Sequence, residues 1–165
     1  METLHEPNPS DRSAPLNRVL GVYRLADHAR FGSRITPGAA EQDLRAFEQR
    51  HHVRLPPDFR EYLALCNGLS VEDSGHFDHE WLGAIEFWSL ATISARRSGV
   101  SGDYFGFADF LIDSHWYVIR LSADVHLSGP TGVGDELGID ERLGNSFSDF
   151  VEVYLHDPDR VLLHS

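Results

Sequence analysis

The chain has 165 residues, a length that predicts one domain whose core is large enough to need no covalent staples. It is 41% hydrophobic and 24% charged, as soluble globular domains are, and its single cysteine, Cys66, excludes an intrachain disulfide. The net charge is −12: residues 1–60 hold nine arginines and eight acids, whereas residues 61–165 hold five arginines and eighteen acids. A field of this sign repels nucleic acid phosphates and anionic lipid and would attract a basic partner, although an acidic surface can also serve solubility alone.

The N-terminal residues do not have the basic start and apolar run of a secretory signal, and no stretch reaches the ~18 apolar residues of a membrane-spanning helix. With one cysteine, the chain fits a reducing compartment, and we expect it to be cytoplasmic. Every basic residue is arginine, which indicates a GC-rich, bacterial coding sequence and excludes lysine chemistry. Residues 1–15 contain three prolines among polar residues and predict a mobile tail, leaving residues 16–165 as a single domain. The apolar run at 17–26 is too short to assign to a helix or a strand.

The first clear helix is predicted to begin near Thr36, which could cap it, with Pro37 in its first turn. Apolar side chains then recur at helical spacing, and the helix should end near His51 and His52. The residues of this apolar face are Ala40, Leu44 and Phe47.

A second helix is predicted from Pro56-Pro57-Asp58 to a stop at Asn67-Gly68, where glycine can adopt the left-handed conformation. Its buried face is predicted to hold Phe59, Tyr62, Leu63 and Cys66.

Strands are predicted at 84–90, 104–112 and 115–121, the last two joined as a hairpin through Asp113 and Ser114. The glycine-rich stretch 123–138 is predicted to be a loop, with at most a short strand near 125–127. A last helix should follow the cap Ser146 and end at Asp157-Pro158. Its buried stripe is predicted to hold Phe147, Phe150, Val151, Tyr154 and Leu155. Helices, then antiparallel strands, then a helix define an α+β class with a mostly antiparallel sheet.

No catalytic set stands out in the sequence. The stretch 129–138 lacks the lysine of a phosphate loop, and no serine lies in a G-x-S-x-G motif. His76, Asp78, His79 and Glu80 could supply metal ligands, but they crowd into five residues without a helical histidine pair. We interpret that segment as a solvated acidic loop, and we expect neither a metal nor a cofactor.

Four short motifs occur in an order that resembles the SMI1/KNR4 family, also called the SUKH superfamily. They are VRLPPDF at 53–59, IEFWSL at 85–90, FADFLIDSHWYVI at 107–119 and NSFSDF at 145–150. Many members carry a glycine- and aspartate-rich turn before the central strand, whereas this chain has LIDSH at 111–115, as in a divergent branch.

The resemblance implies an antiparallel sheet with flanking helices, no catalysis, and a protein partner. Bacterial members look like immunity proteins that neutralise a secreted toxin, often a nuclease, and fungal members are regulatory scaffolds. We therefore expect a basic toxin domain to be the partner. The predicted contact residues are Glu72, Asp73, Asp78, Glu80, Trp81, Asp109 and Asp113. Two alternatives stay open: a general regulatory interaction module, and a metal-dependent hydrolase that uses the 76–80 cluster.

Overall fold

The computed structural model describes residues 35–69, 85–97, 102–110 and 113–162. The predicted tail at 1–15, the run at 17–26 and the acidic loop that includes 72–81 lie outside the described residues. None of the helices within the described ranges has the length and apolar character needed to cross a membrane.

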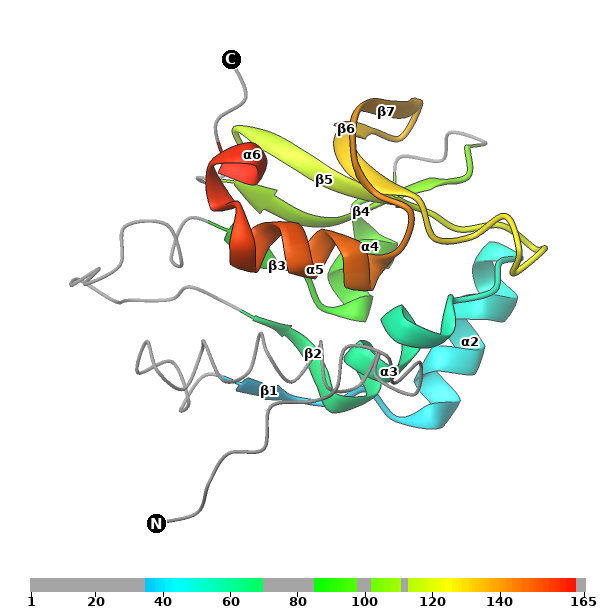
Figure 1. Ribbon diagram of the computed structural model, residues 1–165. Helices are drawn as coiled ribbons and strands as arrows, with labels where there is room; N and C mark the ends of the chain where they lie inside the picture. Colours follow the sequence, from blue (N-terminus) through cyan, green and yellow to red (C-terminus); the bar gives the residue numbers. More distant parts are fainter. Residues whose placement is uncertain (1–34, 70–84, 98–101, 111–112, 163–165) are drawn as a thin grey trace, which may run out of the picture.

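The described part of the chain forms one antiparallel sheet of seven strands in the order β1 to β7, with helices packed against it (Figure 1). Each strand pairs with the next one along the chain, so the α+β prediction with a mostly antiparallel sheet is confirmed. In chain order the elements are β1 (Ile35–Pro37), α2 (Glu41–His51), α3 (Pro57–Leu65), β2 (Cys66–Leu69), β3 (Ile85–Phe87), α4 (Leu90–Ala95), β4 (Tyr104–Phe110), β5 (His115–Arg120), β6 (Thr131–Asp135), β7 (Gly138–Gly144), α5 (Phe147–His156) and α6 (Pro158–Leu162).

Helix α2 buries the predicted Leu44 and Phe47, but its predicted start near Thr36 is wrong. Thr36 lies in β1, which pairs with β2, and the helix begins at Glu41. The delay has a packing cause: a Cβ on Gly38 would lie 1.7 Å from the carbonyl oxygen of Ala64, so the chain passes α3 here in close backbone contact. A tertiary contact therefore overrides the local capping signal.

Helix α3 begins at Pro57 as predicted and buries Phe59, Tyr62 and Leu63. It ends earlier than predicted, at Leu65, because the chain turns directly into β2. Cys66 is therefore a buried strand residue and not a helical one, and its thiol donates to the carbonyl of Gly68.

Helix α5 begins after Ser146, whose hydroxyl accepts from the amide of Asp149, as the cap signal predicted. The amide of Ser148, which also lacks a partner within the helix, donates to the carboxylate of Asp58 at 2.9 Å. The Ser148 hydroxyl donates to the same carboxylate. Asp58 lies in the first turn of α3 and is buried. One carboxylate thus joins the N-termini of two helices that are 90 residues apart in sequence.

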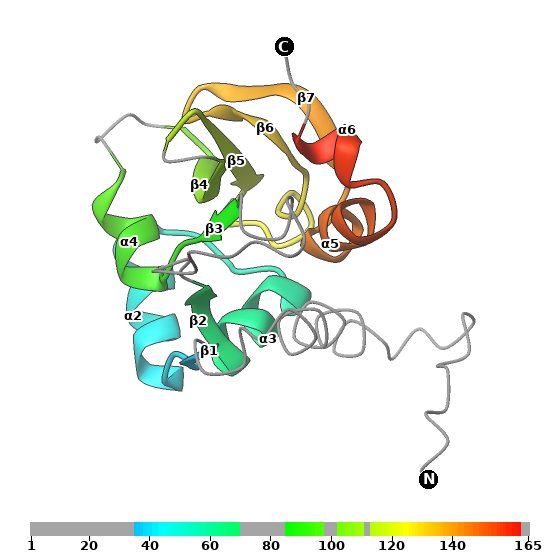
Figure 2. The same cartoon turned by 90° about the vertical axis from the view of Figure 1, so that its left-hand side faces the viewer.

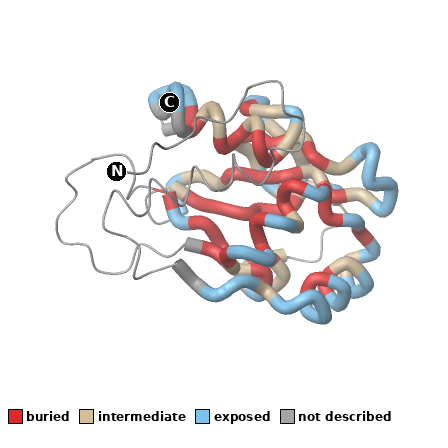
Figure 3. Tube along the Cα trace, turned by 60° about the horizontal axis from the view of Figure 1, so that its bottom comes forward, coloured by how far each residue is buried: buried red, intermediate tan, exposed pale blue. Residues whose placement is uncertain are grey.

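The core lies between the sheet and its helices, and 11 of the 25 buried core residues that the structure describes are aromatic. Figure 3 shows the buried stretches of the chain in red. Phe107 of β4 contacts the rings of Phe59, Phe147 and Phe150 at centroid distances of 6.0, 5.7 and 5.1 Å. Edge-to-face packing of this kind adds to the free energy gained by burying the rings.

The predicted hairpin is confirmed: β4 pairs with β5, and Asp113 at the turn has the left-handed conformation (φ 67). The prediction of a loop at 123–138 is wrong, because β6 lies within it and β7 follows from Gly138. The short strand expected near 125–127 is absent, and those residues form a turn. The glycines that indicated a loop serve a strand: Cβ atoms on Gly132 and Gly134 would lie 2.2 and 2.1 Å from carbonyl oxygens of β7.

Helix α2 contacts α4 and β4 through His51 at its last turn. The imidazole lies 2.8 Å from the hydroxyl of Ser94, and its ring packs against Phe47 and Phe105. Burial, with a smaller effect of the nearby Arg97 guanidinium, lowers the pKa of His51 below 6.5. The folded protein therefore favours the neutral ring.

We expect Asp58→Ala to lower the free energy of unfolding by about 2–3 kcal/mol, because it leaves two buried donors of Ser148 without an acceptor. Urea unfolding followed by circular dichroism measures this. Glu61→Ala, an exposed carboxylate of the same helix, is the control and should stay within about 0.5 kcal/mol of the parent. Equal effects of the two substitutions would contradict the joint role of Asp58.

We expect His51 to make stability depend on pH. Because its folded pKa is lowered, its contribution is complete above pH 6.5 and is lost as the pH falls from 6.5 through the folded pKa. His51→Gln should flatten this part of the stability curve in thermal unfolding between about pH 7.5 and 5. The exposed neighbour His52, in a left-handed conformation that asparagine tolerates, gives the control His52→Asn. A curve unchanged by His51→Gln would contradict the assignment.

Candidate partner-binding surface

Two of the seven predicted contact residues lie in the described part of the chain. Glu72, Asp73, Asp78, Glu80 and Trp81 lie outside it. Their role in binding a partner stays a prediction.

Asp109 is buried, with 3% of its surface exposed, so the structure does not offer its carboxylate to a partner. One carboxylate oxygen accepts the indole N–H of Trp88 at 2.7 Å, and the other accepts the amide of Asp113 at 2.7 Å. The predicted contact role is corrected to an internal one: Asp109 fixes the start of the β4–β5 turn. A register shift between Gly106 and Ala108 and burial on both faces of β4 remove the alternation that would have indicated this.

Asp113 is exposed, and its role in binding a partner stays a prediction. It belongs to a cluster that we call the Trp–Arg cluster: Trp88, Arg96, Asp113 and Trp116. The Asp113 carboxylate accepts from the indole of Trp116 at 2.8 Å and from the guanidinium of Arg96 at 2.6 Å. The hydrogen bond from Trp116 is the largest cause that lowers the pKa of Asp113, and the bond from Arg96 adds to it. Arg96 lies 4.4 Å from the ring centre of Trp88, which meets Trp116 edge to face.

The Trp–Arg cluster is a fixed, partly exposed surface of the residue types that recur at protein interfaces. It requires a glycine beneath it, because a Cβ on Gly106 would lie 2.6 Å from Trp88 and 3.1 Å from Trp116. Sequence reasoning placed Trp88 in a strand, and nothing in the spacing indicated that Arg96 would stack on it.

The β6–β7 hairpin gives a second exposed surface that sequence reasoning missed. Its tip carries Leu137, which is 78% exposed, and the carboxylate of Asp135 accepts the amide of Leu137 at 2.8 Å. Three further acids, Glu136, Asp140 and Glu141, lie at or beside the tip. An apolar side chain surrounded by carboxylates suits a cleft that is basic at its rim and apolar within.

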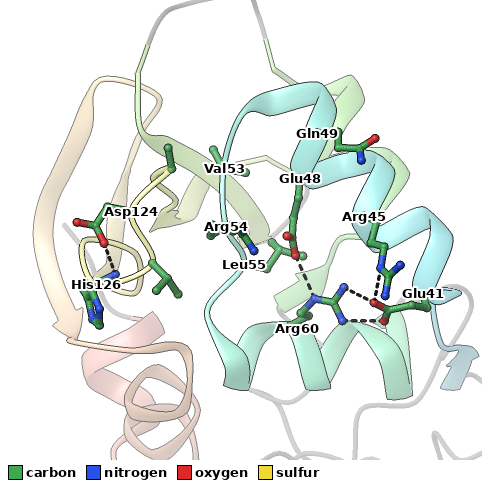
Figure 4. Close-up of a pocket in the computed structure, with 12 residues that line it drawn as sticks. Glu41, Arg45, Glu48, Gln49, Val53, Arg54, Leu55, Arg60, Asp124 and His126 are labelled. Carbon is green, nitrogen blue, oxygen red and sulfur yellow. Dashed lines mark hydrogen bonds and ion pairs between the residues drawn. The ribbon is translucent and has the colours of Figure 1, made fainter.

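An open groove of about 840 Å³ lies between helices α2 and α3 on one side and the turn after β5 on the other (Figure 4). Arg60 of α3 crosses to α2 and bonds Glu41 at 2.7 Å and Glu48 at 3.0 Å, so it locks the two helices together. The Arg60 hydrogen bond is the main cause that lowers the pKa of Glu41 to about 2. The groove is lined by Glu41, Arg45, Glu48, Gln49, Val53, Arg54, Leu55, Arg60, Ala123, Asp124, Val125 and His126.

The described residues contain no group of three or more histidine, cysteine, aspartate or glutamate side chains placed to hold a metal. The predicted 76–80 cluster lies outside the described residues. Ser128 accepts the amide of Ser122 and donates to the carbonyl of Arg54, which gives it a structural role in the turn.

The SMI1/KNR4 family model (SUKH-1) matches residues 38–161, most of the chain, and the chain therefore belongs to this family. The family is known for immunity proteins. No curated protein matches the chain.

We expect Asp109→Asn to lower the free energy of unfolding by about 1–3 kcal/mol, because the Trp88 and Asp113 donors meet different carboxylate oxygens and the substitution replaces one of these acceptors with an NH2 donor. Asp113→Asn is the control: its carboxylate is exposed and should change stability by less than about 1 kcal/mol. Chemical denaturation followed by tryptophan fluorescence measures both. If Asp109→Asn left the free energy of unfolding unchanged, Asp109 would again be a candidate for direct contact with a partner.

Proposed function

We propose that this chain is a protein-binding module that acts without turnover, most concretely an immunity protein that binds and neutralises a bacterial toxin. Its family membership supports the module, and the family's known role supports immunity. The partner we propose is a basic toxin domain, for which a nuclease is the best candidate because its active-site cleft must attract phosphates. The site of action we propose is the cytoplasm of the cell that makes the toxin.

The charge of the C-terminal half carries this proposal furthest. Of the five described arginines of that half, Arg96 pairs with Asp113, Arg120 pairs with Asp103, and Arg97 donates to backbone carbonyls. Arg142 of β7 and Arg160 are exposed, so acids still outnumber cations on this surface. The carboxylates of the β6–β7 hairpin stand on the surface around Leu137. Such a surface would speed the encounter with a basic cleft and select that partner over neutral ones.

The proposed contact surface therefore combines the β6–β7 hairpin with Asp113 and with the predicted residues at 72, 73, 78, 80 and 81. Asp109 is no longer part of it, since its carboxylate is buried and bonded. Leu137 would enter the partner's cleft, and the surrounding carboxylates would pair with its cationic rim.

We expect the chain to protect cells that express the toxin domain encoded beside its gene, and to form a 1:1 complex with that domain by light scattering. Association measured by stopped flow should slow steeply between about 0.05 and 0.5 M salt, as screening of exposed charges requires. No protection and no complex would contradict the immunity function. Salt-independent association would contradict the electrostatic mechanism alone.

A pair of matched double variants places the interface. Asp135→Asn with Asp140→Asn removes two charges from the hairpin, and Asp43→Asn with Glu61→Gln removes two from exposed positions of α2 and α3. The hairpin pair should slow association about tenfold more than the helix pair, and Leu137→Ser should speed dissociation. Equal slowing by both pairs would mean that only the overall field of the protein matters.

A further inference from the structure

The groove beside α2 has a guanidinium that no described residue engages. Arg60 and Arg45 are bonded to Glu41, Glu48 is bonded to Arg60, and the carboxylate of Asp124 accepts the amide of His126. The exposed side chain of Arg54 makes no hydrogen bond or ion pair with any residue that the structure describes. Figure 4 shows Arg54 between the turn that carries Asp124 and His126 and the helix that carries Glu48.

The backbone of Arg54, in contrast, holds the groove together. Its amide donates to the carbonyl of Ser122 at 2.8 Å, and its carbonyl accepts the hydroxyl of Ser128 at 3.0 Å. These bonds fasten the turn to the segment between α2 and α3, while Arg60 fastens α2 to α3. The groove is thus preformed, and a ligand would not have to order its walls.

Apolar side chains lie beside this cation. Val53 and Leu55 line the floor on either side of Arg54 and are largely buried, at 8% and 4% exposure, whereas Val125 of the turn is 39% exposed on the opposite wall. Leu127, at the end of the same turn, is 47% exposed. Two of the large hydrophobic side chains that the described surface leaves to water therefore stand on this one turn, a clustering typical of binding sites.

The geometry points to a peptide-binding groove, and we propose that its ligand is an extended segment of a partner protein in which an aspartate or glutamate adjoins aliphatic residues. The carboxylate pairs with Arg54 in a bidentate bond, and the aliphatic side chains pack against the exposed Val125 of the turn. The volume of about 840 Å³ lies in the range of pockets that enclose ligands of a few residues.

This ligand is opposite in charge to the one proposed for the β6–β7 hairpin. The groove holds three arginines, three acids and His126, and is therefore close to neutral, whereas the chain as a whole carries −12. The inference does not depend on toxin neutralisation, because the two surfaces share no residue.

The test is a selection of random twelve-residue peptides on the full chain by phage display, followed by fluorescence anisotropy with a labelled synthetic copy of an enriched peptide. We expect the enriched peptides to share an aspartate or glutamate beside leucine, isoleucine or valine. Arg54→Gln should weaken binding about tenfold, as loss of a charged hydrogen bond predicts. Arg50→Gln, an exposed arginine of α2 outside this groove, should leave it unchanged.

A peptide with asparagine or glutamine in place of the acid completes the comparison. If the carboxylate of the acidic peptide meets Arg54, the neutral peptide should bind the parent and the Arg54→Gln variant equally weakly. Circular dichroism of each variant confirms that it is folded. Enrichment of no peptide, enrichment without acidic residues, or equal binding to the Arg54 and Arg50 variants would each overturn the proposal.

Discussion

The fold depends on a carboxylate that two helices share. Asp58 lies in the first turn of α3 and accepts both donors of Ser148 at the start of α5, so the two helices cannot separate without leaving buried polar groups unpaired. The aromatic core then fills the space that this bond defines: Phe59 follows Asp58, Phe147 precedes Ser148, and their rings lie 5.0 Å apart. A polar bond of this kind specifies how the helices meet, while burial of the rings supplies most of the stabilisation.

Fixing α3 and α5 in this way leaves the other elements to present surfaces. Arg60, one turn into α3, locks α2 and so forms one wall of the groove. Across the core, α5 contacts β6 and β7, which end in the acidic hairpin with Leu137 at its tip. The Trp–Arg cluster stands over Gly106, where any side chain would meet an indole. Each surface is held by hydrogen bonds before any partner arrives, which suits a protein that acts by binding.

The sequence predicted those elements whose local signals agree with their packing. Pro57 and Ser146 mark helix starts that the structure confirms, and the alternation at 85–87 marks β3. It failed where contacts between distant segments decide the outcome. Thr36 and Pro37 resemble a cap, but the close passage of Gly38 past Ala64 delays the helix; the glycines of β6 indicate a loop, but they let β7 approach. Asp109 looks like a surface acid because the sequence cannot reveal that Trp88 and Asp113 donate to it. Arg54 becomes a candidate binding residue only because a turn distant in sequence packs beside it and completes the groove.

Native-state hydrogen exchange of the Ser148 amide tests the central role of Asp58 most directly. If the shared carboxylate holds the two helices together, this amide opens only when the whole domain unfolds, with the same opening free energy as the amide of Ile119 in the middle of β5. The two values should then fall in parallel as urea is added. An opening free energy for Ser148 that is clearly smaller and insensitive to urea would show that the start of α5 opens locally, and would contradict the account.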